Sequence, residues 1–281
     1  MPEIISCRAC GKETYAEVPK CPHCGEIFEW NPQPEQDVSI SIGVGSVISR
    51  SLKILFRNIF PFMVLALLVT SPSFLFEVFV LPNLDANQAV GFGAIAGLLG
   101  WMLSFVLTGA LTYGTFMEMK GEKARFGDVV TKGISMIIPV LGVAIISQIL
   151  VMIGMVMLII PGIIASLMLF VAVPVSVIEK TTVQQSLVRS VDLTKGNRWQ
   201  ILGIYLLTAL LSFVIILVPA IIIVFAIGTL GGETIQASQI GNYLGGAFGG
   251  AYFAVVIAVT YHDLRVAKEG LDTDQLAAVF D

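Results

Sequence analysis

Long apolar segments separated by short charged ones make up most of the chain after its first forty residues. Five runs carry almost no charge: 59–81, 89–117, 133–178, 199–232 and 240–261. Only Glu77 interrupts them. The third run is long enough for two bilayer crossings of about 20 residues each, with Pro161-Gly162 as the turn between them. The pattern therefore predicts an all-α polytopic membrane protein with six transmembrane helices.

A second pattern precedes the first, third and fifth of these spans. Each preceding segment places apolar residues at helical spacing beside lysine or arginine. The three stripes are Val44, Ile48, Leu52, Leu55 and Ile59; Phe126, Val129, Val130, Ile134 and Ile137; and Val183, Leu187 and Val191. Such amphipathic helices lie in the headgroup layer or pack against the bundle as connectors, and the sequence leaves both open. Their recurrence before each hairpin suggests an internal threefold repeat.

Composition and charge support this architecture. The chain is 56% hydrophobic and only 13% charged, whereas soluble domains are about a quarter charged. All 16 lysines and arginines fall in the N-terminal head or in segments predicted to lie on one side of the bilayer. The opposite connections, around Asp85, Pro161-Gly162 and Glu233, hold none. Because short cytoplasmic loops collect basic residues, both termini are expected in the cytoplasm, and the protein in the cell membrane.

All four cysteines stand in the first 24 residues, as two Cys-x-x-Cys pairs each followed by glycine: Cys7, Cys10, Cys21 and Cys24. Four thiolates at this spacing suit tetrahedral zinc, and the absence of an N-terminal leader pattern favours zinc over disulfides or redox chemistry. His23 is a neighbour rather than an expected ligand. The sequence thus predicts a zinc ribbon over residues 1–30, a proline-containing linker over 31–38 and a six-span membrane domain over 39–281.

The charge of the predicted zinc head bears on its role. Residues 1–37 contain seven acidic and three basic residues, so the head lacks the cationic face that nucleic-acid phosphates require. Nucleic acid is therefore not expected as a partner. A structural cap in which zinc supplies the folding energy, with protein docking as a further role, is the expected function of the head.

Residues 160–199 and the C-terminal segment carry a family resemblance. Pro161-Gly162-Ile163, the stretch SLVRSVDLTKGNRW at 186–199 and YHDLR at 261–265 together resemble the membrane domain attached to some bacterial glycerophosphodiester phosphodiesterases. The resemblance covers about residues 39–281 and implies a fold rather than an activity. In those enzymes a separate soluble barrel hydrolyses the substrate, and this chain has neither room for such a barrel nor its histidines, holding only His23 and His262.

The densest polar cluster near the predicted membrane follows the fourth span. It comprises Glu179, Arg189, Asp192, Lys195 and Arg198. An ion pair between Glu179 and Arg189 would tie the third amphipathic helix to that span, and structural pinning or contact with lipid is expected before ligand binding. Three weaker candidates are Glu77, Gln148 and the His262-Asp263 pair, and no nucleophile accompanies the last of these.

No catalytic constellation stands out, so the chain is expected not to be an enzyme. The first hypothesis is a non-catalytic membrane protein that organises lipid or partner proteins, with the zinc head as a docking module. A transporter or channel for a small or lipid-like solute, and an intramembrane lipid-headgroup enzyme, are the alternatives. Glycines spaced by four predict close helix packing and a candidate homo-oligomer contact: Gly241, Gly245, Gly249, and Gly93 with Gly97.

Overall fold

The computed structural model describes residues 4–6, 13–15, 24, 42–122, 126–229 and 234–270. The chain divides into two compact units, Met1–Ile40 and Ser41–Asp281, which are considered separately. In the first unit, β1 (Ile4–Ser6) and β2 (Glu13–Tyr15) pair antiparallel. Cys7, Cys10 and Cys21 lie outside the described residues, and Cys24 is exposed. The zinc ribbon therefore stays a prediction.

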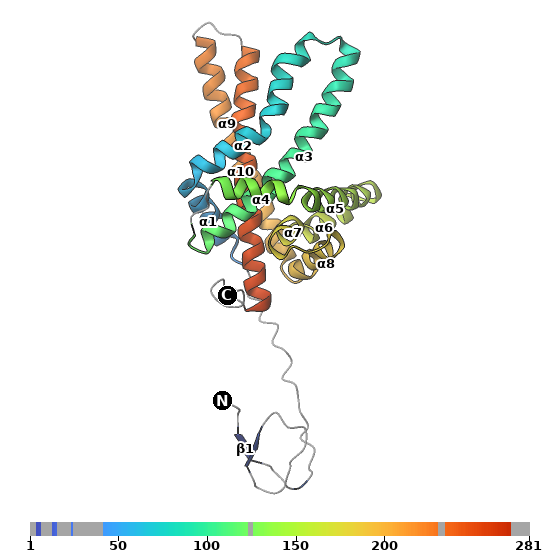
Figure 1. The fold of residues 1–281 in the computed structure, drawn as a ribbon, viewed down its shortest axis with the longest axis vertical. Coiled ribbons are helices and arrows are strands. Elements are labelled where there is room, and N and C mark those ends of the chain that lie inside the picture. The colour runs from blue at the N-terminus through green and yellow to red at the C-terminus, as the bar shows by residue number, and fades with distance from the viewer. Residues whose placement is uncertain are drawn as a thin grey trace. The chain divides into compact units, whose positions relative to one another are not determined.

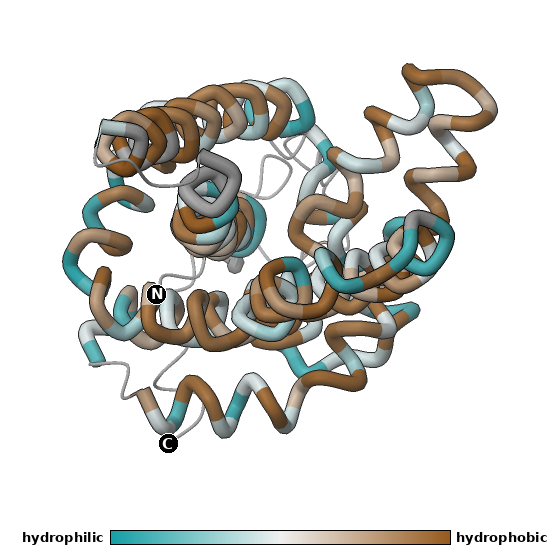
Figure 2. Tube along the Cα trace, turned by 90° about the horizontal axis from the view of Figure 1, so that it is seen from above, coloured by the Kyte–Doolittle hydropathy of each residue, from teal (hydrophilic) through white to brown (hydrophobic). Residues whose placement is uncertain are grey.

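The second unit is helical throughout its described part. Its elements are α1 (Val44–Arg57), α2 (Ile59–Leu75), a π-helix (Phe76–Val80), a 3-10 helix (Leu81–Asn83), α3 (Ala86–Met119), α4 (Phe126–Ser135), α5 (Ile137–Met157), α6 (Ile159–Met168), α7 (Ala172–Glu179), α8 (Val183–Thr194), α9 (Arg198–Thr229) and α10 (Thr234–Glu269). Six segments are long and apolar enough to cross a membrane, as the sequence predicted. Most of the tube in Figure 2 is correspondingly coloured as hydrophobic.

Helix α10 organises this unit, since it contacts α1, α2, α3, α7, α8 and α9. Its glycines allow close approach to α9: a Cβ at Gly245 would lie 3.2 Å from the Ile216 Cα. On another side, the Tyr243 hydroxyl donates a 2.6 Å hydrogen bond to the Leu67 carbonyl of α2. The predicted packing role holds for Gly245. It does not hold for Gly97, since no neighbouring atom lies within 4 Å of where a Cβ of that residue would be.

The amphipathic helix α1 packs against the bundle. Val47 and Leu55 are fully buried, and α1 contacts α9 and α10, while Arg50 and Lys53 stay on the outside. Helix α4 behaves differently, because Phe126 and Ile134 of its predicted apolar stripe are exposed. Both helices therefore pack against the bundle, α4 through the buried Val129 and its contact with α3, but α4 also exposes Phe126 and Ile134 of its predicted apolar stripe.

Helix α8 buries a different face from the one that the sequence predicted. Val183, Leu187 and Val191 are only partly buried, and the inner face instead consists of Ser186, Ser190, Leu193 and Thr194. The hydroxyls have a physical reason to point inward, because the neighbouring α6 ends there and its last carbonyl lacks a helical partner. The three helices therefore bury chemically different faces, which weakens the expected threefold repeat.

The predicted fourth span is broken into α6 and α7 at residues 169–171. The turn before it also lies earlier than expected, at Leu158, while Pro161 and Gly162 fall within the first turn of α6. Proline is tolerated there because an amide hydrogen in the first helical turn would lack a partner in any case. Gly162 instead permits close contact with α5, since its Cβ would lie 2.7 Å from the Met155 amide nitrogen.

Candidate functional site

The polar cluster begins at a tight turn between α7 and α8. Lys180 ends α7 with a positive φ of 51° and redirects the chain. Thr182 then starts α8 in a capping box: its backbone N–H donates to the Gln185 side chain at 3.1 Å, and its hydroxyl accepts from the Gln185 amide at 3.5 Å. This reciprocal bonding satisfies amides that a helix start otherwise leaves free. The turn sets Glu179 and Arg189 opposite each other.

Hydroxyl groups hold α8 against the end of α6. Ser190 donates to the Met168 carbonyl at 2.8 Å, and Thr194 reaches the same oxygen at 3.3 Å. Ser186 bonds the Thr182 carbonyl at 2.9 Å and the Thr181 hydroxyl at 2.8 Å. Met168 is the last residue of α6, so these bonds satisfy a carbonyl that the helix itself leaves unpaired. These bonds therefore fix the position of α8 relative to the end of α6.

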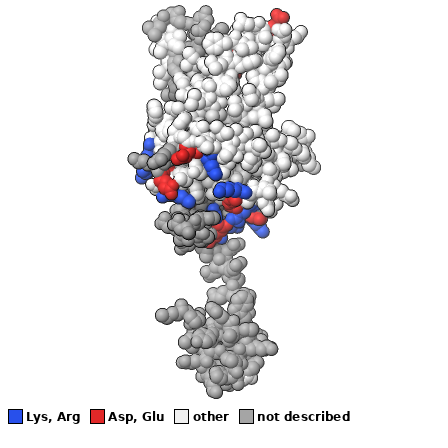
Figure 3. Space-filling model, in the orientation of Figure 1, with Lys and Arg blue, Asp and Glu red and all other residues white. Residues whose placement is uncertain are grey.

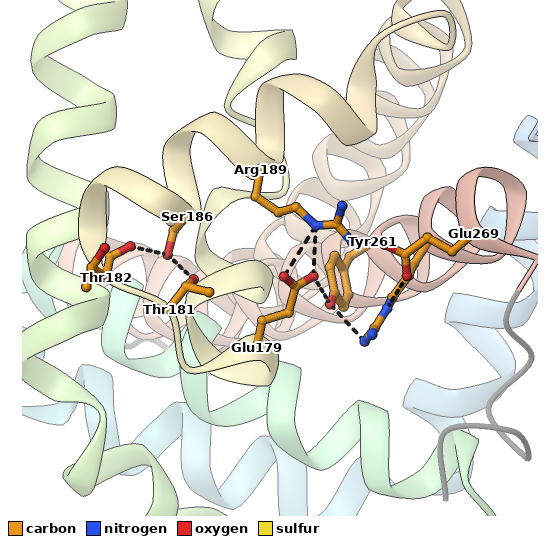
Figure 4. Close-up of polar contacts among 8 residues, drawn as sticks. Glu179, Thr181, Thr182, Ser186, Arg189, Tyr261 and Glu269 are labelled. Atoms are coloured by element: carbon orange, nitrogen blue, oxygen red, sulfur yellow. Dashed lines mark hydrogen bonds and ion pairs between the residues drawn. The ribbon is translucent and has the colours of Figure 1, made fainter. Parts of the chain in front are cut away.

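An ion network joins this helical turn to α10, as Figure 4 shows. Arg189 Nε lies 3.3 Å from Glu179, and another guanidinium nitrogen of Arg189 pairs with Glu269. Glu269 also accepts from Arg265 at 2.9 Å. The Tyr261 hydroxyl donates to Glu179 at 2.9 Å. Two carboxylates thus meet two guanidinium groups, and the network is formally neutral.

The sequence identified only one half of this network. Tyr261, Arg265 and Glu269 were not among the predicted site residues, although their spacing of four places them on one face of a helix. That spacing is the only signal in the sequence that could have grouped them. Their meeting with Glu179 and Arg189 depends on how α10 packs beside α7 and α8, and local patterns do not encode this packing.

The remaining predicted residues are spread around the network. Asp192 is exposed and borders an open cavity of about 460 Å³, which Glu179 and Arg189 also line. Lys195 is exposed at the end of α8, with no ion-pair partner in the described part of the chain. Arg198 opens α9, and no described group hydrogen-bonds its buried Nε. The five residues are therefore not one site.

Other charged groups at this end of the unit are also paired. Arg50 of α1 pairs with Asp263 of α10, whose other oxygen lies 3.3 Å from His262 Nδ1. Arg57 lies 2.8 Å from Glu118. Asp263 of the His262-Asp263 pair is thus bound to Arg50, and this ion pair links α1 to α10.

The two polar candidates within the spans lie away from these contacts. Glu77 is exposed in the π-helical segment, close to the α2–α3 connection. Gln148 is exposed near the middle of α5. A second cavity of about 460 Å³ is lined by apolar side chains and one glycine: Phe56, Met63, Val214, Ile215, Val218, Leu244, Gly245 and Phe248. Neither Glu77 nor Gln148 lines it.

Among the described residues, no group of three or more His, Cys, Asp or Glu side chains is placed to hold a metal ion. The predicted zinc ligands do not enter this search, apart from Cys24. Comparison with protein-family models, with curated proteins and with solved structures finds no match.

Proposed function

We propose that the chain is a non-catalytic integral membrane protein that gathers anionic lipid, or proteins that bind such lipid, at one end of its helical unit. In this proposal both termini are cytoplasmic, and the predicted zinc head, formed by Cys7, Cys10, Cys21 and Cys24, is a docking module for a protein partner. The resemblance to the membrane domain of glycerophosphodiester phosphodiesterases is part of the same proposal, as a likeness of fold without the hydrolase.

The observation that carries the proposal is the distribution of charge in the helical unit. Figure 3 shows its Lys and Arg side chains gathered at one end. Four of the arginines there pair with carboxylates, namely Arg50, Arg57, Arg189 and Arg265, whereas Lys53, Lys180 and Lys195 are among the cations without an ion-pair partner in the described residues. Unpaired lysines near a bilayer surface attract anionic headgroups, by about 1 kcal/mol each. Among the described residues of this end, the unpaired cations outnumber the unpaired carboxylates Glu122, Asp128 and Asp192, so the unpaired charge is net cationic.

The pairing of the acidic groups argues against catalysis at the candidate site. A general acid or base needs a carboxylate or imidazole that reaches a substrate. Here Glu179 is bonded to Arg189 and Tyr261, and Glu269 to two arginines. The network is better suited to fastening α10 to the α7–α8 turn, which favours the structural role over an enzyme of lipid headgroups.

A lipid-enrichment experiment tests the proposal. The full-length chain is extracted with its surrounding lipid in polymer discs, and the anionic fraction of that lipid is compared with the bulk membrane. We expect enrichment in the wild type and a several-fold smaller enrichment in the triple variant Lys53→Gln, Lys180→Gln and Lys195→Gln. Asp85→Asn, which changes a charge on the α2–α3 connection, serves as the matched control and should match the wild type.

Lipid composition equal to the bulk membrane around the wild-type protein would contradict the proposal. So would a triple variant that retains full enrichment, because the unpaired lysines would then play no part.

A further inference from the structure

The α5–α6 hairpin runs in a different direction from the other two apolar hairpins. In Figure 1, helix α10 runs along the vertical axis, and α9 and the α2–α3 hairpin extend in about the same direction. Helices α5 and α6 extend across it. The contacts agree with this arrangement: α5 touches α3, α4, α6, α7 and α8, and residues 148–157 of its outer half are exposed apart from Val151 and Gly154. A bilayer that α10 crosses would therefore meet this hairpin side-on.

Helix length points to the same conclusion. Helix α6 has 10 residues and is about 15 Å long, half of the roughly 30 Å of a hydrocarbon core. The chain then turns at residues 169–171, and α7 continues inside the protein with Ala172 and Val175 buried. The apolar run that looks like one span is thus two short helices, neither of which crosses a bilayer alone.

The tip of the hairpin is apolar where a loop in water is expected to be polar. Residues 156–160 are Val, Met, Leu, Ile and Ile, and each is 69 to 83% exposed. The tip of the α2–α3 hairpin instead carries Asn83, Asp85 and Gln88. Exposed apolar side chains at both the tip and the flanks are stable only in hydrocarbon.

The tip backbone is also adapted to such surroundings. The Leu158 amide donates to the Gly154 carbonyl at 3.1 Å, and the Gly162 amide donates to the Leu158 carbonyl at 3.4 Å. Pro161 has no amide hydrogen to leave unpaired. A Cβ at Gly154 would lie 2.9 Å from the Gly162 Cα, so the two helices touch directly behind the turn. These two bonds and the proline reduce the number of unpaired amides at the turn, which the lipid interior favours.

The position of Gln148 supplies an independent argument. It lies near the centre of α5 and is exposed. In a helix that crossed the bilayer it would face lipid near the midplane, where an unbonded amide is costly. In a helix lying along the bilayer surface, the same amide reaches the headgroup layer.

From these observations we propose that the α5–α6 hairpin is a re-entrant wedge, embedded among the acyl chains of the leaflet at the cationic end, whose tip stays within the hydrocarbon. Four helices then cross the bilayer: α2, α3, α9 and α10. The partner of the hairpin surface is the acyl layer of a single leaflet.

Site-directed labelling of the full-length chain in vesicles tests the wedge. Leu158→Cys and Ile160→Cys probe the tip, and Asp85→Cys marks the end opposite the cationic one. A membrane-impermeant maleimide is added to either side, and the modified peptides are identified by mass spectrometry, which separates them from the native cysteines. We expect position 85 to react from one side and positions 158 and 160 to react from neither.

A fluorophore at position 158 then reports depth. We expect acyl-chain quenchers to reduce its emission at least several-fold more than headgroup quenchers do. Reaction of position 158 or 160 from either side, or quenching strongest at the headgroups of the leaflet next to position 85, would overturn the proposal. Ile160→Cys keeps the test valid if Leu158→Cys alone does not fold, and the melting temperature of each variant is compared with the wild type.

Discussion

The α2–α3 and α5–α6 hairpins are about equally apolar, yet they are built for different surroundings. The first has two long helices, a connection with the polar residues Asn83 and Asp85, and a capping box between Asp85 and Gln88. The second has one long and one short helix joined by a single residue, Leu158, with no polar side chain near the turn. The difference shows that the residues at the ends of an apolar segment indicate better than its mean hydropathy whether the segment crosses a bilayer.

The two hairpins are also fastened differently to α10. The α2–α3 hairpin packs directly on it, with Phe74 and Tyr243 stacked at 4.2 Å between ring centroids. The α5–α6 hairpin reaches α10 through α7 and α8, whose link to it includes the ion network around Arg189. One attachment is apolar and the other polar, so substitutions should affect them separately.

The largest effect is expected from Gly162→Leu in α6. The new Cβ would lie 2.4 Å from Met155 Cγ and 2.7 Å from the Met155 amide nitrogen, so α5 and α6 must separate. We expect a loss of about 3 kcal/mol, the upper end for overpacking, measured as a lower melting temperature in detergent. Gly97→Leu in α3 is the control, since nothing lies within 4 Å of that glycine. Equal melting temperatures for the two variants would refute the close contact.

The next effect concerns the polar attachment. Arg189→Met leaves Glu179 and Glu269 with fewer partners, in a site where Arg189 is 32% exposed. Breaking a buried pair costs about 3–5 kcal/mol, and partial exposure reduces this to about 2 kcal/mol. Hydrogen exchange should rise in residues 137–194 and remain unchanged in 59–119. Lys53→Met, at an exposed lysine with no ion-pair partner among the described residues, is the control, and uniform exchange across both hairpins would contradict separate attachment.

A smaller effect is expected on the other side of α10. Tyr243→Phe removes the hydrogen bond to the Leu67 carbonyl, and about 1 kcal/mol of stability should be lost. Tyr205→Phe is matched to it, because no hydrogen bond of the Tyr205 hydroxyl is found among the described residues. Should both variants melt at the same temperature, the Tyr243 bond contributes nothing to the α2 contact.

The smallest effect is expected from Gln148→Leu. If α5 lies within one leaflet with the Gln148 amide reaching the headgroups, the amide is solvated and its loss changes stability by less than about 0.5 kcal/mol, as at ordinary surface positions. A helix that crossed the bilayer would instead be stabilised clearly by losing a lipid-facing amide. Melting temperatures of the wild type and the variant in lipid discs distinguish the two cases.

Local patterns in the sequence predicted much of this architecture. The six apolar segments, the break near Pro161 and the ion pair between Glu179 and Arg189 each depend on residues close together in the chain. The contribution of Tyr261 and Glu269 was not predictable, because it joins residues about eighty positions apart. The inner face of α8 was also missed, since Ser190 and Thr194 point inward only because α6 ends against them.

The central claim is that the described cationic side chains of the helical unit lie on one side of the bilayer, opposite the α2–α3 connection. Peptide-resolved labelling of Asp85→Cys and Lys53→Cys in sealed vesicles tests it directly. We predict that an impermeant reagent on one side modifies position 85 alone, and that position 53 reacts only when the other side is exposed. Modification of both positions from the same side of intact vesicles would contradict the account.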